Sequence, residues 1–170
     1  MSTPTEVWLR GPVPGIAPVL QPAAHALIQA REDVLAMATS VSTERLWTRH
    51  DGAASAGFHL LHLAGALDRL FTYARGEALN DAQKFALRAE TQDHPELGGA
   101  GLAAIVATQI DRALEQLAAT DPARVFDERK IGRAGLPSNV LGLLFHAAEH
   151  TTRHVGQFVT TVKLLPPDAE

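Results

Sequence analysis

Apolar residues recur at helical spacing in four long stretches of the chain. In the first stretch Val19, Ala23 and Leu27 follow one another at intervals of four, and a similar period continues in the others. No stretch convincingly alternates apolar and polar residues with the period of two that marks a half-buried strand. The pattern therefore predicts four long helices, over residues 18–39, 55–75, 102–119 and 139–165.

Residues with strong preferences at helix ends support these limits. The first helix is expected to start near residues 18–22, because the prolines there are tolerated only around a first turn. Ser55 can accept the N-cap hydrogen bond of the second helix, and Gly76 is placed to end it. The pair Pro166-Pro167 is expected to close the fourth helix.

The segments between the long helices are expected to be mostly irregular. A short helix is predicted over residues 81–90, a loop over residues 93–101, and irregular chain over residues 123–136. The last segment contains the most basic patch of the sequence, residues 129–133.

Nothing divides the chain into separate domains. Residues 1–15 carry three prolines and two glycines, which predicts an extended N-terminal arm that Trp8 fixes to the body of the protein. The sequence has no internal repeat and no low-complexity segment, and its 170 residues are the usual length of one domain. We therefore expect a single all-α domain over residues 1–170. Four long helices joined by loops predict a four-helix bundle, whose facing helices can build a metal site.

Composition narrows the chemistry that such a bundle can carry. The sequence contains no cysteine, which excludes disulfides, iron–sulfur clusters and thiolate catalysis and leaves nitrogen and oxygen as metal ligands. The net charge of −4, with no block of five like charges, argues against nucleic acid as a partner and against a polybasic membrane anchor. No segment has the roughly 20 apolar residues that span a bilayer, and the N-terminus lacks the pattern of a signal peptide. The expected location is the cytoplasm.

Five of the eight histidines fall in two of the predicted helices: His59 and His62 in the second, and His146, His150 and His154 in the last. Neighbouring members of the last set are four residues apart. They therefore form one stripe along the helix, in which each histidine is turned by about 40° around the axis and shifted by about 6 Å along it. The outer two are about 12 Å apart along the axis, too far to share an ion that binds nitrogen at about 2.0–2.1 Å. A single site therefore uses His146 with His150, or His150 with His154. His150 belongs to either pair.

The stripe alone is a weak signal, because helical histidines are also found exposed or bonded to helix carbonyls. Histidines on two separate helices strengthen the metal interpretation, since buried imidazoles need partners for their nitrogens. The segment from His146 to His150 also fits the HxxEH pattern of inverted zincins. A helical wheel places Glu149 on the polar strip of the helix, which argues against that interpretation. No general base is assigned.

Two further side chains lie on nearly the same azimuth as His62 in the second helix. Arg69 and Tyr73 follow it by seven and eleven residues, with the small Ala66 between. If His62 binds a metal ion, Arg69 and Tyr73 would line the same cavity one or two turns away. They are therefore candidate substrate-binding residues for an anionic or polar group.

The last predicted helix is apolar on its far side as well, at Leu141, Phe145, Ala148 and Val159. A helix that is apolar on two sides is either central in its bundle or shared with a partner, and we expect a homodimer. Gly156 costs this helix about 1 kcal/mol relative to alanine, which indicates close approach of another backbone there.

Two segments resemble the motifs of the DinB/YfiT-like family. Residues 57–70, GFHLLHLAGALDRL, look like the second-helix motif of that family, and residues 150–157, HTTRHVGQ, resemble its HxxxHxGQ signature. The order and spacing of the two motifs also match, so the resemblance covers essentially the whole chain. Val155 departs from the commoner HRGQ ending, which weakens the transfer of a detailed activity.

The resemblance implies a four-helix bundle, often in a homodimer, with a three-histidine site for zinc, nickel or a similar divalent ion. By motif position, the metal ligands would be His62, His150 and His154. Three further residues would lie around the site without binding the ion: His59, His146 and Gln157.

Members of the family that are characterised as enzymes are metal-dependent hydrolases or low-molecular-weight thiol transferases and isomerases. The resemblance therefore implies a metal-dependent hydrolase or a small-thiol-dependent transferase that acts on a small molecule. Three imidazoles leave a coordination position to water, as in catalytic rather than closed structural sites. Because the chain has no cysteine, any thiol would come from a cosubstrate. The alternative is a non-catalytic metal-binding or stress-response protein, in which the ion only holds the helices together.

Overall fold

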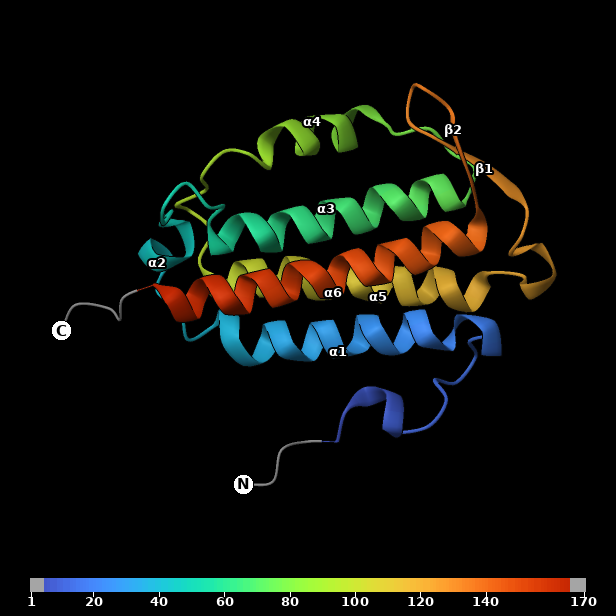
Figure 1. Cartoon of the computed structure of the whole chain (residues 1–170), viewed down its shortest axis with the longest axis horizontal. Coiled ribbons are helices and arrows are strands. Elements are labelled where there is room, and N and C mark those ends of the chain that lie inside the picture. The colour runs from blue at the N-terminus through green and yellow to red at the C-terminus, as the bar shows by residue number, and fades with distance from the viewer. Residues whose placement is uncertain (1–4, 166–170) are drawn as a thin grey trace.

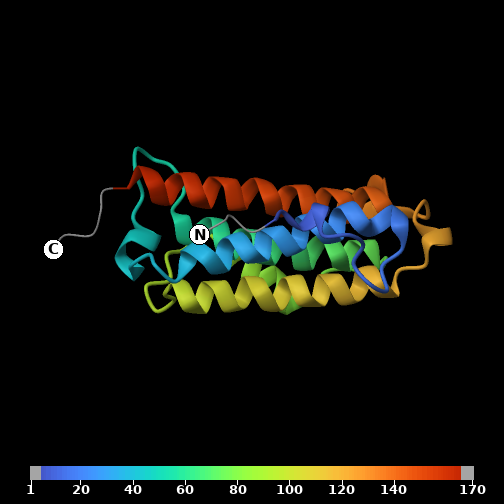
Figure 2. The same ribbon diagram turned by 90° about the horizontal axis from the view of Figure 1, so that it is seen from below.

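The computed structural model describes residues 5–165, and four long helices make up most of this range. They are α1 (Gln21–Ala38), α3 (Ala56–Ala74), α5 (Gly99–Ala119) and α6 (Val140–Leu164). The helices lie side by side as a bundle, in which α3 and α6 pack against each other most extensively (Figures 1 and 2). The predicted all-α four-helix bundle is confirmed. The proposed stop at Pro166-Pro167 lies outside the described residues.

The four long helices do not alternate in direction. Helices α1 and α6 run one way along the bundle, and α3 and α5 run the other way (Figure 1). Each of them packs against two neighbours, because α6 and α5 both contact α1 and α3. Since α3 and α5 are parallel, the chain must return along the bundle between them. The short helix α4 (Asp81–Ala89) makes this return on the outer side of α3.

The core is aliphatic, with two phenylalanines among its largest side chains, and all four long helices contribute to it. The largest fully buried side chains are Leu20, Leu27, Leu46, Leu60, Leu63, Leu67, Phe71, Leu102, Ile110, Leu117, Leu143 and Phe158.

No helix within residues 5–165 combines the length and the apolar composition that a membrane span requires.

The ends of α3 and α6 are capped by the residues that their sequences provide. Ser55 Oγ accepts a hydrogen bond of 3.2 Å from the N–H of Phe58, and Gly76 follows α3 with a φ of +83°. Asn139 Oδ1 accepts one of 2.7 Å from the N–H of Gly142 at the start of α6. The predicted limits of these two helices are correct to about one residue.

The first helix starts where its prolines predicted, whereas the third starts earlier than its periodicity predicted. Helix α1 begins at Gln21, after a 3₁₀ turn over Pro18–Leu20. Helix α5 begins at Gly99, inside the segment that was predicted to be a loop. A Cβ at Gly99 would overlap the carbonyl oxygen of Ala38, so this glycine lets the start of α5 approach the end of α1.

A short helix and two short strands were missed. Helix α2 (Thr43–Trp47) has only five residues, and strands β1 (Glu128–Ile131) and β2 (Leu136–Asn139) have four each. The strands pair antiparallel, with Ile131 opposite Leu136, so the prediction of irregular chain over residues 123–136 is partly wrong. Elements this short contain too few residues to show a period.

The N-terminal arm is held by a residue other than the predicted one. Within a 3₁₀ turn over Val7–Leu9, Val7 is buried and its N–H donates a hydrogen bond of 3.0 Å to Gln29 Oε1. Trp8 is 62% exposed, so its predicted anchoring role is wrong.

Helix α6 is apolar on two sides because it lies between α3 and α1. Ala148 is buried, whereas Phe145 is 61% exposed. The expected approach of a backbone to Gly156 is wrong within the described chain, because nothing lies within 4 Å of a Cβ built there.

The contact at Gly99 predicts a difference between two glycines of the same helix. We expect Gly99→Ala to lower the free energy of unfolding by about 1–3 kcal/mol, because the added methyl group overlaps the α1 backbone. The control Gly101→Ala has only the flexible Leu97 side chain nearby, at 3.8 Å, and should gain up to about 1 kcal/mol from helix propensity. Urea denaturation followed by circular dichroism measures both, and equal effects would contradict the packing argument.

Candidate metal centre

Three histidines of α3 and α6 converge on one point. His62, near the start of α3, and His150 and His154, in the middle of α6, each offer a ring nitrogen, and these nitrogens lie within 4.8 Å of one another. The rings of His62 and His154 are 4.6 Å apart between centroids, and those of His150 and His154 are 4.5 Å apart. The structure thus brings together the three ligands that the sequence motifs implied.

The spacing of these nitrogens suits a bound ion. His62 Nε2 and His150 Nε2 are 3.1 Å apart. Two nitrogens at about 2.0–2.1 Å from one ion lie about 2.9–3.4 Å from each other for bond angles between octahedral and tetrahedral. The neighbours also select which nitrogens face inward, since His62 Nδ1 is 2.9 Å from Glu90 and His154 Nδ1 is 3.1 Å from His59 Nδ1. The Nε2 atoms of His62 and His154 are therefore left for a ligand.

The protonation state of the cluster also favours a cation. Burial, and after it electrostatic repulsion from the neighbouring His62, lowers the pKa of both His150 and His154 to about 4. Their rings are therefore neutral near pH 7, with a lone pair on each. His150 Nδ1 is buried and has no hydrogen-bond partner among residues 5–165. Neutral imidazole nitrogens are the donors that zinc, nickel and similar ions prefer, so the residues present fit such an ion.

Glu90 was missed by the sequence analysis, and it is the carboxylate of this site. It follows the last residue of α4 and is 5% exposed. Its Oε2 accepts a hydrogen bond of 2.9 Å from His62 Nδ1, and its Oε1 accepts one from Arg69 Nη1. A carboxylate behind a metal-binding histidine fixes the tautomer and orientation of the ring. Glu90 therefore positions His62.

Glu90 is ionised in this environment. Burial alone would raise the pKa of its carboxyl, but the hydrogen bonds from His62 and Arg69 outweigh burial and hold the pKa below its ordinary value. Because Arg69 and His62 occupy both oxygens, Glu90 is placed to orient its neighbours.

A glycine makes room for this carboxylate. A Cβ at Gly65 would overlap Glu90 Oε1 and would lie 2.7 Å from Arg69 Nη1. Gly65 stands three residues after His62 and four before Arg69, on the same face of α3. A glycine inside a helix costs about 1 kcal/mol, and its place between these two residues was the signal in the sequence that another side chain enters there.

The remaining predicted site residues occupy different surroundings. Arg69 is buried and binds Glu90, and Tyr73 lines a separate basic pocket near the β-hairpin. Their role in substrate binding stays a prediction. Helix α6 exposes His146, whose ring is 5.6 Å from that of His150. Gln157 is exposed, and no hydrogen bond within residues 5–165 joins its side chain to the histidines.

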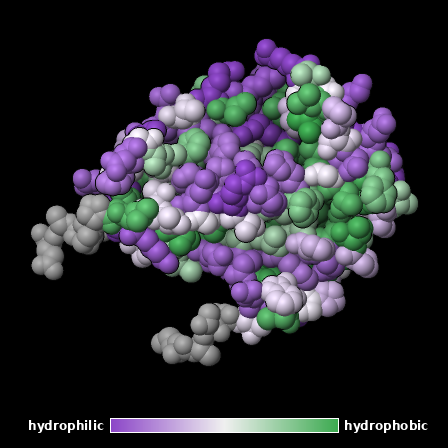
Figure 3. All heavy atoms as spheres, viewed as in Figure 1, coloured by the Kyte–Doolittle hydropathy of each residue, from purple (hydrophilic) through white to green (hydrophobic). Residues whose placement is uncertain are grey.

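Solvent reaches the cluster from the α3–α6 face. The His62 side chain is 23% exposed, and Phe58 stacks on its ring with centroids 5.2 Å apart and planes at 11°. Hydrophilic side chains gather over the middle of α6 on this face, where Arg153 is exposed and bonded to Glu149 (Figure 3). Glu149 therefore faces outward, as the helical wheel predicted.

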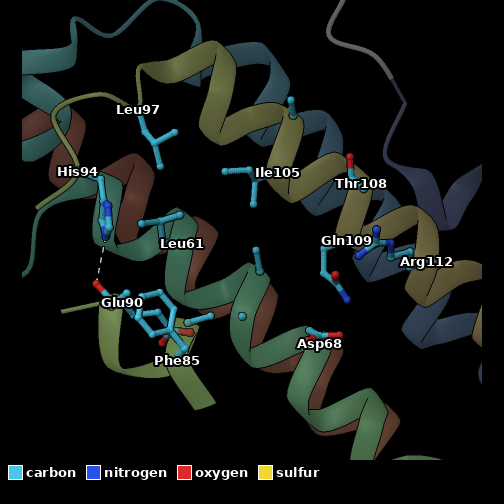
Figure 4. Close-up of a pocket in the computed structure, with 15 residues that line it drawn as sticks. Leu61, Asp68, Phe85, Glu90, His94, Leu97, Ile105, Thr108, Gln109 and Arg112 are labelled. Carbon is cyan, nitrogen blue, oxygen red and sulfur yellow. Dashed lines mark hydrogen bonds between the residues drawn. The ribbon is translucent and has the colours of Figure 1, made fainter. Parts of the chain in front are cut away.

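A hollow of about 630 Å³ lies between α3, α4 and α5. His94 and Glu90 lie at one end of it, and Asp68 and Arg112 lie at the other (Figure 4). None of the three clustered histidines lines it. Glu90 thus separates this hollow from the candidate metal centre.

The chain is thus a four-helix bundle with three histidines clustered between α3 and α6. The model of the DinB superfamily matches residues 26–158, and the chain belongs to that superfamily. No curated protein matched the chain.

Solved structures share the fold at low sequence identity. A conserved protein from Enterococcus faecalis is 19% identical with a TM-score of 0.67, and the match covers 86% of this chain and 96% of that one. YfiT from Bacillus subtilis, described as a probable metal-dependent hydrolase with an unusual four-helix bundle topology, is 14% identical with a TM-score of 0.59, over 88% and 91% of the two chains. A Streptococcus pneumoniae protein is 13% identical with a TM-score of 0.59, over 83% and 86%.

The buried network predicts a large effect on stability. We expect Glu90→Ala to lower the free energy of unfolding by about 3–5 kcal/mol, because it leaves the buried guanidinium of Arg69 without its counter-ion. The control Glu77→Ala breaks an exposed pair with Arg75 and should cost no more than about 1 kcal/mol. Denaturant titration in the presence of a chelator measures both, and a similar small loss for the two variants would refute the network.

Proposed function

We propose that this chain is a metal-dependent hydrolase that binds one divalent ion, zinc or nickel, through His62, His150 and His154. The observation that carries the proposal is the convergence of three histidine side chains, one of which is oriented by a buried, ionised carboxylate. Histidines that serve only packing have no need of a carboxylate that fixes one tautomer.

The openness of the cluster favours catalysis over a purely structural ion. Structural zinc sites are closed by four protein ligands, whereas catalytic sites have three and leave a position to water or substrate. Only three residues of the described chain form the candidate group, and His62 is partly exposed. When bound at such a site, a divalent ion lowers the pKa of a coordinated water toward about 7 and polarises a substrate carbonyl.

The residues of the chain would then hold the ligands in place. Glu90 keeps a proton on His62 Nδ1 and so directs Nε2 toward the site. Arg69 keeps Glu90 ionised and fixed. His59 Nδ1 contacts Nδ1 of His154, so Nε2 of His154 stays available for a ligand. Phe58, stacked on His62, gives a small apolar substrate group a surface next to the ion.

Ligand identity can be tested by metal binding alone. After chelation and dialysis, the native protein should bind one equivalent of zinc or nickel in isothermal titration calorimetry, and His150→Ala should lose tight binding. His146→Ala, one turn away on the same helix, should keep one equivalent. Glu90→Gln should keep the stoichiometry but weaken affinity by about 10–100-fold. One tight equivalent in His150→Ala would show that the ligand assignment is wrong.

Turnover decides between the reaction classes. We expect a panel of esters and amides to be hydrolysed by the native protein, with activity lost on chelation and restored by the metal. Activity that appears only when a small thiol is added would favour the thiol transferase instead. A bound metal without any metal-dependent turnover would favour the non-catalytic alternative.

We also propose a homodimer through the outer face of α1 and α6. Phe145 stands exposed there, beside a hollow of about 370 Å³ that includes Pro22 and Ala26 of α1. Light scattering should give twice the mass of the 18.2 kDa chain, and Phe145→Asp should give the single mass. The control Phe126→Asp, also at an exposed phenylalanine, should stay dimeric. A native monomer at micromolar concentration would refute the proposal.

A further inference from the structure

A second pocket lies where the end of α3, helix α4 and the β-hairpin meet. Figure 1 shows α4 and the hairpin on the same outer side of α3. The pocket encloses about 750 Å³. Its lining comes from three separate parts of the chain: Tyr73 to Leu79 at the end of α3 and just beyond it, Lys84 to Arg88 of α4, and Lys130 to Arg133 of the hairpin.

This pocket carries a positive net charge, whereas the net charge of the whole chain is negative. Its lining contains four cations, Lys84, Arg88, Lys130 and Arg133, and one carboxylate, Glu77, for a net charge of +3. The whole chain has a net charge of −4. A concave surface that gathers one sign of charge focuses its field and attracts an ion of the other sign.

Three of the four cations have no partner among the described residues, whereas Lys84 pairs with Asp81 at 3.0 Å. Within residues 5–165, the side chains of Arg88, Lys130 and Arg133 form no hydrogen bond and no ion pair. Glu77, the one carboxylate of the lining, is bonded to Arg75 at 2.8 Å. Arg88, Lys130 and Arg133 therefore leave positive charge in the pocket with which a bound anion can pair.

Hydrogen bonds hold the hairpin against the end of α3, where its cations line the same pocket as those of α4. Arg129 Nε donates a hydrogen bond of 2.8 Å to the carbonyl of Ala74 at the end of α3. The turn after β1 is closed by a hydrogen bond of 3.2 Å from Gly135 N–H to the Gly132 carbonyl, and both glycines have positive φ. The metal site does not use this basic segment, and the structure places part of it against a pocket.

The same pocket also has apolar walls. Leu79, Leu87 and the ring of Tyr73 line it together with the cations. Such a mixture suits an organic ion better than a bare inorganic one, because the apolar part of the ligand covers these side chains.

We propose that this pocket binds a small organic anion, whose carboxylate or phosphate lies among Arg88, Lys130 and Arg133 and whose apolar part packs against Tyr73, Leu79 and Leu87. The site is separate from the metal centre. Tyr73 follows His62 by eleven residues, a distance of about 16 Å along α3. Binding of the anion therefore needs no metal, and the proposal is independent of the proposed hydrolase activity.

The probes are phenyl phosphate and benzoate, with inorganic phosphate as the probe that has charge alone and benzyl alcohol as the neutral one. Calorimetric titrations of the full chain use a chelator and low ionic strength, where surface charges are least screened. We expect phenyl phosphate or benzoate to bind at one site, about tenfold more tightly than inorganic phosphate, and benzyl alcohol not to bind. Whichever organic probe binds more tightly shows whether the pocket prefers a phosphate or a carboxylate group.

Charge reversal locates the site. Arg133→Glu and Arg88→Glu should each weaken binding of the organic probe by about tenfold or more. The control Lys163→Glu makes the same change of net charge in the last turn of α6 and should bind like the native chain. His150→Ala should bind the probe unchanged, which separates this site from the metal centre.

Three outcomes would overturn the proposal. They are no saturable binding of either organic probe, equal affinity for inorganic phosphate and phenyl phosphate, and unchanged affinity in both Arg133→Glu and Arg88→Glu. The second would reduce the pocket to a nonspecific anion site. Amide chemical shifts of the arginine variants, compared with those of the native chain, show whether each remains folded.

Discussion

The packing of α3 against α6 is the contact on which the rest of this structure depends. Side chains of both helices are shared between the core and the histidine cluster, so the contact that buries Leu60 and Phe158 also holds His62 against His150 and His154. Core packing is dense and tolerates little displacement. Nitrogen atoms on two different helices can therefore be kept at a spacing that suits one ion.

The connection between α3 and α5 adds the second element of the site. Because these helices are parallel, the chain returns along the outside of α3 through α4, and this return delivers Glu90 behind His62. The ion pair of Glu90 with Arg69 is almost fully buried. Buried pairs often contribute little net stability but impose a definite geometry. Here the pair fixes the orientation of a ring that faces the candidate metal position.

The same return of the chain separates two chemical environments on α3. Near its start, three clustered histidines and one satisfied carboxylate form a site suited to a cation. Near its end, unpaired arginine and lysine side chains form a pocket suited to an anion. Each site includes one residue of α3, His62 in the first and Tyr73 in the second, and these residues are about 16 Å apart along the helix.

The sequence by itself determined the helices that have strong periodicity and clear caps. It also showed that the three histidines of α6 are too far apart to bind one ion together, and it carried the family motifs. These are local properties, carried by residues within a few turns of one another. Only the tertiary structure decided that Glu90 joins His62, that Arg69 is used by Glu90, that Tyr73 faces a different pocket, and that α5 starts at Gly99. Each of these depends on contacts between segments far apart in the chain. A helical wheel gives the direction of a side chain but not the partner that packing brings to it.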